Sequence, residues 1–369
     1  MPVSPTLVGL QRLLSQHIAE SSHSSPAALV AHFGAVQAQD YNAALWAIGL
    51  RCRIDSERIV QAAVADRSIV RSWPLRGTLH FVAAADLRWM LSLLSTRQLR
   101  AGAKRFRELE LDEQISKRSQ ELLRKALEGG RQLTREELYH ALEQGGVSTD
   151  HQRGYHLLWR ASQEQVICWG PRRGKEMTFV LLDDWIPRTA PLTADESICK
   201  LATRYFTSHG PATLHDFVWW SGLTVAEART GIETSGAALA ERQIGGRSYW
   251  SSVAAGAPEA EPMRAAASIQ ETAFLLPAFD EYVVAYRDRS DLLEPAFART
   301  LNAGGGMIKP VAVVAGHVVG VWKRTLRKGR VEIEVTPFRK LAASKRRMLE
   351  LAVERYGSFV GVPAEMSIL

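Results

Sequence analysis

Hydrophobic and polar positions between residues 116 and 183 predict three helices followed by a pair of strands. Apolar residues spaced three or four apart indicate helices at 119–127, after Thr134 and at about 152–163. Thr134 and Glu137 have the spacing of a capping box at the start of the second helix. Apolar segments at 166–169 and 177–181 then flank the basic turn 170–175, which predicts a hairpin. Three helices and a hairpin in this order are typical of a winged helix, a variant of the helix-turn-helix.

The same order recurs in residues 194–253 and, less completely, near the N-terminus. The later copy has predicted helices at 197–207, at 215–221 after Thr213 and after the cap Thr224, and then a hairpin that turns at Gly245-Gly246 and ends at Tyr249-Trp250. The early copy has Asp55 capping a helix at 57–65, and strands at 69–73 and 78–82 around a turn at 74–77. A generic helical hairpin with two strands explains any single copy, whereas three copies together favour tandem winged helices.

Strands alternate after about residue 259, beyond an alanine-rich linker at 254–267. The predicted strands are 274–277, 282–286, 311–314, 317–322 and 330–335, and a helix at 344–356 closes this part. We therefore predict an α+β fold with tandem winged-helix motifs followed by a small β-rich domain. The expected segments are 1–115 (a first winged-helix-like region), 116–190 and 191–258 (the second and third winged helices) and 259–369 (the β-rich domain).

Two glutamines, Gln37 and Gln39, bracket a single alanine at the end of a helix-like segment. Ser25-Pro26 has the pattern of an N-cap followed by proline at the first helical position, and Gln37 falls four residues after Phe33 on the apolar stripe. Residues two apart lie about 200° apart around a helix but on one side of an extended segment. The two amides therefore converge only if the helix ends near Ala38. An ordinary helix end with incidental glutamines explains the same pattern.

The length and composition are those of a folded protein with a large interior. A chain of 369 residues suggests two or three domains or one composite body. Hydrophobic residues make up 46% and charged residues 23%, which disfavours a disordered chain. The net charge of +7 favours a polyanionic partner, although proteins that never bind nucleic acid also carry such an excess.

The densest basic cluster lies between two predicted strands. It carries five positive charges: Lys323, Arg324, Arg327, Lys328 and Arg330. A solvated turn explains such a cluster, but five charges at one tip favour contact with phosphates.

Several common kinds of site lack their sequence patterns. No nucleophile elbow, phosphate-binding loop, zinc-protease helix or dinucleotide fingerprint is present, and Gly304–Gly306 is interpreted as a surface turn. Three cysteines without a CxxC pair or a His/Cys cluster at zinc spacing predict neither a disulfide nor a metal site. The ten histidines, among them His80, His209 and His215, are interpreted as packing or surface residues, and Asp280-Glu281 as the cap of a turn.

The chain shows no leader pattern at Met1, and its longest apolar stretch, 310–322, is too short to span a bilayer. We therefore expect a cytoplasmic protein.

Five short motifs resemble the AlkZ-like family of helix-turn-helix DNA glycosylases. They are Val36-Gln37-Ala38-Gln39-Asp40, Arg71-Ser72-Trp73-Pro74-Leu75-Arg76-Gly77-Thr78-Leu79-His80, Gly210-Pro211-Ala212-Thr213-Leu214-His215-Asp216-Phe217, Trp220-Ser221-Gly222-Leu223, and Leu275-Leu276-Pro277-Ala278-Phe279-Asp280 with Arg287. The resemblance covers essentially the whole chain. Other branches of the family carry aspartate or histidine at one of the two glutamine positions.

The resemblance implies a C-shaped body of tandem winged helices that grips double-stranded DNA, and the removal of bulky N7-alkylated purines with unhooking of interstrand crosslinks of the azinomycin type, in repair or self-resistance. We expect a monofunctional glycosylase because no amine nucleophile is required, and a nucleoid-associated monomer because a body that encloses DNA within one chain needs no partner. No metal or cofactor is expected. Gln37 and Gln39 become the catalytic pair. The DNA-contacting residues become the five hairpin cations together with Arg172, Arg173, Lys175, Arg71 and Arg76. A possible secondary site comprises Asp40, Trp73 and Asp280.

The chemistry of such a substrate agrees with a pair of neutral amides. N7 alkylation gives the purine a positive charge, so the base departs without a strong general acid through an oxocarbenium-like transition state. Two amides can orient the attacking water at any pH. A transcription regulator or a DNA-bending protein is the alternative, because winged helices also bind operators. A regulator would normally have a dimerisation helix, and no heptad seam is present.

Overall fold

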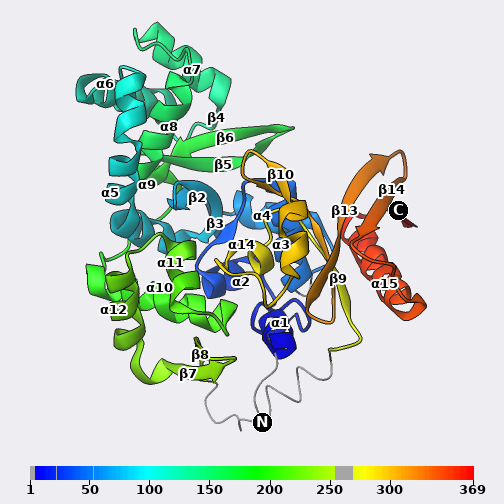
Figure 1. The fold of residues 1–369 in the computed structure, drawn as a ribbon. Coiled ribbons are helices and arrows are strands. Elements are labelled where there is room, and N and C mark those ends of the chain that lie inside the picture. Colours follow the sequence, from blue (N-terminus) through cyan, green and yellow to red (C-terminus); the bar gives the residue numbers. More distant parts are fainter. Residues whose placement is uncertain (1–4, 22, 53, 254–268) are drawn as a thin grey trace. The chain divides into compact units, whose positions relative to one another are not determined.

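The structure is a computed structural model that describes residues 5–21, 23–52, 54–253 and 269–369 (Figure 1). The predicted linker at 254–267 lies outside the described residues. The chain divides into two compact units, which we call unit 1 (residues 1–60 and 198–369) and unit 2 (residues 61–197). This division does not follow the boundaries of the four predicted segments, since residues 1–60 pack with the C-terminal half. The division into winged-helix segments stays a prediction.

Unit 2 combines a small sheet with a group of helices. The helices are α5 (Ala84–Glu108), α6 (Glu113–Leu127), α7 (Arg135–Gln144), α8 (Arg153–Gln163) and α9 (Leu182–Trp185). The strands are β2 (Ile69–Leu75), β3 (Thr78–Ala83), β4 (Leu133–Thr134), β5 (Ile167–Arg173) and β6 (Glu176–Leu181). Within this unit the order is β3-β2-β5-β6-β4, with antiparallel neighbours. Helix α4 (Glu57–Ala65) joins unit 1 to unit 2.

Local signals in the sequence place the ends of these helices. The capping box of Thr134 and Glu137 is present, with Glu137 accepting from the Thr134 N–H at 2.7 Å. Helix α6 begins six residues earlier than predicted, because Asp112 caps it by accepting from the Ile115 N–H at 2.7 Å. The hairpin β5–β6 turns at Gly174-Lys175 rather than over 170–175, so the basic residues before it belong to a strand.

The N-terminal and central parts of unit 1 are mostly helical. They contain α1 (Pro5–Ser15), α2 (Pro26–Phe33), β1 (Val36–Gln37), α3 (Tyr41–Arg51), α10 (Ala194–His209), α11 (Leu214–Ser221), α12 (Val225–Ser235), the short η1 (Gly236–Ala238), β7 (Leu239–Ile244) and β8 (Arg247–Ser252). The expected caps Thr213 and Thr224 both form capping boxes, and β7 and β8 form the expected hairpin. Three helices followed by a hairpin therefore occur in 113–181 and again in 194–252.

The C-terminal part of unit 1 is built on a five-stranded sheet in the order β15-β14-β13-β12-β9. Its strands are β9 (Ala273–Leu276), β12 (Val311–Val314), β13 (His317–Arg327), β14 (Arg330–Pro337) and β15 (Ala364–Ile368), of which β14 and β15 are parallel. Helix α15 (Ala343–Val360) packs against the sheet (Figure 1). The shorter elements are α14 (Glu281–Val284), η2 (Pro295–Leu301), β10 (Asn302–Gly304) and β11 (Met307–Ile308).

One predicted strand in this part is wrong. Residues 282–286 begin as the short helix α14, because the Asp280 carboxylate caps it by accepting from the Tyr282 N–H at 2.9 Å. The whole turn of helix is buried, so its sequence is as apolar as that of a core strand. Gly304–Gly306 form the exposed turn between β10 and β11, as expected.

The predicted mixture of helices and strands is confirmed. The three cysteines, Cys52, Cys168 and Cys199, are free thiols. Among the described helices, none is both long and apolar enough to cross a membrane.

Candidate active site

The Gln37–Gln39 segment is extended, and it begins where helix α2 ends. The helix stops at Phe33 because its C-cap, Gly34, adopts φ 81° and ψ −50°, a conformation that residues with a Cβ rarely take. The helix therefore ends four residues earlier than the apolar stripe predicted, and Gln37 is not a helical residue. Glycine often follows the last residue of a helix, so Gly34 was a signal for this end in the sequence. The prediction instead extended the helix along the apolar stripe.

Burial alternates along this segment and places both glutamines on one side. Val36 and Ala38 are buried in the core, whereas Gln37 is half-buried and Gln39 is exposed. Successive residues of an extended chain point to opposite sides, so Gln37 and Gln39, two residues apart, share the side opposite the core. Oε1 of Gln37 is buried and has no hydrogen-bond partner among the described residues, which leaves an acceptor available at this position.

A buried carboxylate holds the backbone of Gln37. Oε1 of Glu281, on α14, accepts a hydrogen bond from the Gln37 N–H at 2.7 Å. Oε2 of Glu281 accepts from the Trp220 indole N–H at 3.0 Å and lies 3.4 Å from Nε2 of His209. Glu281 is 2% exposed, so its charge depends on these donors for compensation. Burial lowers the pKa of His209 despite the neighbouring carboxylate.

The preceding residue, Asp280, is bound by a buried arginine. Arg51, at the end of α3, donates to both carboxylate oxygens of Asp280, at 2.9 and 2.7 Å, and to Oε1 of Gln16 at 2.8 Å. The Gln16 amide in turn donates to the Tyr286 hydroxyl at 3.0 Å. A bidentate pair of this kind is directional as well as strong. Through Arg51, these hydrogen bonds connect the N-cap of α14 to the end of α3 and to Gln16, the residue that follows α1.

A second buried network organises the motif that contains Asp216. Asp216 accepts from the Thr213 N–H at 2.9 Å in its capping box and from the Arg287 N–H at 2.8 Å. Arg12 stacks on the Tyr286 ring at 3.7 Å, donates to the Pro211 carbonyl at 2.9 Å and lies 4.0 Å from the Asp216 carboxylate. Arg12 and Asp216, which are far apart in the sequence, thus both contact the segment that follows α14, at Tyr286 and Arg287.

Known proteins resemble this chain in sequence and in overall fold. The model of the DNA glycosylase AlkZ-like family matches residues 30–359. The chain belongs to the AlkZ-like DNA glycosylase family. A curated relative from Streptomyces sahachiroi, an interstrand DNA cross-link repair glycosylase, is 28% identical over 353 residues, covering 89% of this chain and 88% of its own length. The solved structure of the Streptomyces sahachiroi DNA glycosylase AlkZ covers 100% of both chains with a TM-score of 0.79 and 25% identity.

In this AlkZ-like glycosylase the basic hairpin is partly neutralised by its own strands. Lys323 pairs with Glu334 at 2.5 Å, and Glu332 accepts from Arg327 at 3.0 Å and from Arg330 at 2.8 Å. Arg324 donates to the Tyr356 hydroxyl. Lys328 at the turn is exposed and has no ion pair within the described residues.

An exposed apolar side chain lies at the same tip. Leu326 is 61% exposed, between the paired cations Arg327 and Arg324. This residue was not predicted from the sequence, because a single leucine in a basic turn carries no periodic signal.

The other predicted DNA contacts lie in unit 2 and differ in exposure. Arg173 and Lys175 are exposed, and Arg173 pairs with Glu137 at 2.7 Å. Arg172 and Arg76 are half-buried, and Arg71 is 5% exposed with its guanidinium 5.1 Å from the Trp169 ring. A cation as buried as Arg71 contributes to packing in this structure rather than to an exposed surface.

The three residues of the predicted secondary site have structural partners. Asp40 caps α3 by accepting from the Ala43 N–H at 3.0 Å, and Asp280 is bound by Arg51. Trp73 is buried in the core of unit 2, 5.4 Å from the Trp169 ring and 6.5 Å from the Phe179 ring. A shared secondary site of these residues stays a prediction.

The position of Glu281 was not predicted from the sequence. Asp280-Glu281 were interpreted as the cap of a turn, which is correct for Asp280, while Glu281 extends to the glutamine segment. The available signal was two adjacent carboxylates in an otherwise apolar stretch, 274–286, because an acidic residue in a core segment needs buried donors.

Proposed function

We propose that this chain is a monofunctional DNA glycosylase that hydrolyses the N-glycosidic bond of cationic N7-alkylpurines. In this proposal Gln37 and Gln39 orient the attacking water beneath C1′ of the damaged nucleotide. The product is an abasic site in an intact strand, since no amine nucleophile takes part.

The observation that carries this proposal is the held glutamine segment. The Glu281 carboxylate fixes the backbone of Gln37, while Oε1 of Gln37 is buried and unpaired among the described residues. An acceptor held in place in this way can receive a hydrogen bond from water without losing orientation entropy at the moment of reaction. Neutral amides keep the same hydrogen-bonding capacity over the whole physiological pH range.

Glu281 supports this chemistry as a positioning residue. Both of its oxygens already accept hydrogen bonds, from the Gln37 N–H and from the Trp220 indole N–H. It therefore orients the glutamine segment through the backbone. A cationic N7-alkylpurine needs no acid, because the base leaves as a neutral molecule.

We extend the proposal to bulky and crosslinked purines. The Streptomyces sahachiroi relative is named an interstrand DNA cross-link repair glycosylase, and it matches most of this chain. A crosslinked base resists rotation out of the duplex into a closed pocket, so an enzyme that unhooks it works with an accessible site. The exposure of Gln39 fits this requirement.

Duplex binding is assigned to the winged-helix elements and to the hairpin β13–β14. The order of three helices and a hairpin in 113–181 and 194–252 supports the winged-helix interpretation. At the tip of β13–β14 the unpaired Lys328 suits a phosphate, and the exposed Leu326 suits the apolar surface of a groove or a base step. In this proposal the enzyme acts as a monomer, because its glutamine pair and the carboxylate that holds it come from one chain. It works in the cytoplasm, at the nucleoid, because its substrate is DNA.

The deciding experiment is single-turnover incubation with a duplex containing one N7-methylguanine and with a duplex crosslinked between two N7 purine positions. We expect release of the modified base and strands that stay intact until alkali cleaves them at the abasic site. Tight binding without base release would contradict the proposal and favour a regulator or a DNA-bending protein. Strand cleavage before alkali would contradict the monofunctional mechanism.

A further inference from the structure

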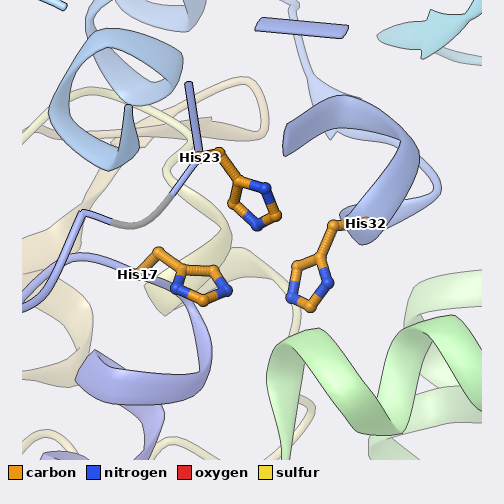
Figure 2. A group of neighbouring side chains, drawn as sticks. All are labelled: His17, His23 and His32. Atoms are coloured by element: carbon orange, nitrogen blue, oxygen red, sulfur yellow. The ribbon is translucent and has the colours of Figure 1, made fainter. Parts of the chain in front are cut away.

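Three histidines from separate segments of unit 1 meet at the N-terminal helices. His17 follows α1, His23 lies in the connection between α1 and α2, and His32 is in the last turn of α2. Their ring centroids are 4.5 Å apart for His17 and His23, 4.9 Å for His17 and His32, and 5.0 Å for His23 and His32. Figure 2 shows the three rings turned toward one another around a shared space.

The polar atoms of this cluster are incompletely paired by the protein. Nε2 of His23 and Nε2 of His32 are buried and have no hydrogen-bond partner among the described residues. A buried ring nitrogen without a partner is unfavourable, and native structures normally supply a donor, an acceptor or an ion. Two such atoms in one cluster point to a ligand.

Burial favours the neutral form of these three rings. Burial, followed by the neighbouring histidines, lowers the pKa of His17 and of His32 to about 4. Burial also lowers the pKa of His23. Neutral imidazole, with a free lone pair on one nitrogen, is the form that ligates a transition metal.

We propose that His17, His23 and His32 together bind one divalent transition-metal ion of the zinc type. One ligand nitrogen from each residue lies within 4.8 Å of the others. Ligands about 2.0–2.1 Å from a tetrahedral zinc ion are about 3.4 Å apart, so small side-chain rotations bring the three rings into coordination. Imidazole ligands select zinc, copper or nickel over magnesium and calcium. All three residues are half-buried, so the cluster is not sealed inside the core.

The ion would connect the end of α1, the α1–α2 connection and α2. His32 immediately precedes Phe33, the last residue of α2, and Phe33 packs on His209 with ring centroids 5.0 Å apart. Four residues after Phe33 comes Gln37, whose backbone is held by Glu281 beside His209. Metal binding therefore stabilises the N-terminal support of the glutamine segment, and the inference stands independently of the reaction that this segment performs.

Sequence spacing alone gave no indication of this site. Five residues lie between His17 and His23, and eight lie between His23 and His32. This pair of spacings differs from the short spacings of known zinc motifs, and no cysteine lies between the histidines. The helical turn at α1 and the return of the chain through α2 bring the three positions together.

The test uses the full chain without a polyhistidine tag, stripped with a chelator and then dialysed against Zn²⁺. We expect one equivalent of zinc per chain by elemental analysis and a melting temperature that rises with zinc concentration, since an ion that binds only the folded state stabilises it. Cobalt is expected to give a visible d–d absorption band. The variant His17→Gln/His23→Gln/His32→Gln should lose the equivalent of zinc and the thermal shift.

The matched control is His140→Gln/His151→Gln/His156→Gln in unit 2, which removes the same number of imidazoles and should keep full zinc binding. The single variant His23→Gln, with two ligands left, should bind zinc at least about tenfold more weakly. Far-UV circular dichroism of each variant without metal verifies that it folds. Equal zinc binding by the triple variant and the control, or no equivalent bound by the stripped wild-type chain, would overturn the proposal.

Discussion

Gln37 and Gln39 share one side of an extended segment but differ in their surroundings. Gln37 is half-buried, its backbone is bound by Glu281, and its Oε1 is an unpaired acceptor among the described residues. Gln39 is exposed, next to the Asp40 cap of α3. A group held by its surroundings contributes more to a transition state than one that must be ordered first. Gln37 is therefore expected to contribute more than Gln39.

We predict that Gln37→Ala and Gln39→Ala each slow base release from N7-methylguanine DNA. Loss of one preorganised polar group typically costs about 10² to 10³ in rate, or roughly 3 to 4 kcal/mol of transition-state stabilisation. The measurement is a single-turnover rate at saturating enzyme, with Gln144→Ala on α7 as an exposed control. Wild-type rates for both variants would show that the glutamine pair is not catalytic.

Gly34 determines where α2 stops, and we predict that Gly34→Ala destabilises the protein. Its φ of 81° with ψ of −50° is unfavourable for any residue with a Cβ, at a cost of about 1–3 kcal/mol. Gly222, the C-cap of α11, lies in the left-handed helical region at φ 75° and ψ 13°, so Gly222→Ala should cost about 1 kcal/mol. Urea unfolding of both variants compares the two positions. Equal losses would show that the unusual conformation of Gly34 carries no extra strain.

Helix α14 is the element on which the site depends. The helix has only four residues, but its N-cap Asp280 and its first residue Glu281 are both acidic and have separate structural functions. Asp280 caps the helix and pairs with Arg51. Glu281 accepts hydrogen bonds from the Gln37 N–H and the Trp220 indole N–H. As a strand, this segment would present its residues alternately and could not direct both carboxylates to buried donors in this way. The short helix is therefore part of how the fold builds the site.

We predict that Glu281→Ala slows base release and lowers the free energy of unfolding by a few kcal/mol. Two buried donors, the Gln37 N–H and the Trp220 indole N–H, would lose their acceptor, at about 1–3 kcal/mol each. Trp220→Phe removes only the indole donor. A double-mutant cycle of these two changes should give a coupling energy of about 0.5–3 kcal/mol. Additive effects would show that Glu281 and Trp220 are not coupled, and a wild-type rate of base release for Glu281→Ala would show that Glu281 does not hold the segment.

Some cations of the hairpin β13–β14 form ion pairs with neighbouring carboxylates, and at least one forms none within the described part of the chain. Its turn residue Lys328 has no ion pair among the described residues, whereas Arg327 and Arg330 share Glu332. We predict that Lys328→Ala reduces the slope of log K against log salt by about 0.9, the contribution of one phosphate contact. Glu332→Gln releases two cations and should steepen the slope. Titration of a fluorescent duplex at several salt concentrations measures both, and unchanged slopes would identify the tip as a solvated turn.

The whole chain joins two units whose cores are built from different parts of the sequence. Unit 1 includes the first 60 residues and everything from Ile198 onward, so its glutamine segment and the residues that hold it are separated by more than half the chain. Unit 2 contains its own sheet and helices, with Trp73, Trp169 and Phe179 in its core. The C-shaped grip on DNA that the family resemblance implies stays a prediction.

For the complete enzyme we predict release of cationic N7-alkylpurines, including a bulky adduct, and no release of uracil. The glutamine pair supplies no proton, and the oxygens of Glu281 are committed to the Gln37 and Trp220 donors. A neutral base leaves as an anion, so its barrier stays high without an acid. Matched duplexes carrying N7-methylguanine, a bulky N7 adduct or uracil provide the measurement. Efficient uracil release with N7-methylguanine untouched would contradict both the mechanism and the substrate class.

Much of the secondary structure follows from the sequence because its signals are local. The capping box at Thr134 forms as predicted, and Thr213 and Thr224 begin their helices as expected, since each cap depends on side chains only three residues apart. The hairpin turning at Gly245-Gly246 likewise needs only its own turn residues and the flanking strands. The glutamine pair was identified at this level too, although its extended geometry was placed at the end of a helix that stops earlier.

The support of the site was decided by tertiary structure alone. Glu281 meets Gln37 across 244 residues of sequence, and Arg51 meets Asp280 across 229. Tertiary contacts also gathered His17, His23 and His32 into one cluster, whereas the predicted strand became α14 through its local cap Asp280. Local pattern cannot report such contacts, because the free energy that selects them comes from pairing buried charges and donors that are distant in sequence. The sequence by itself predicted Gln37 and Gln39 as the residues that carry the chemistry, and the packing of unit 1 decided what holds them in place.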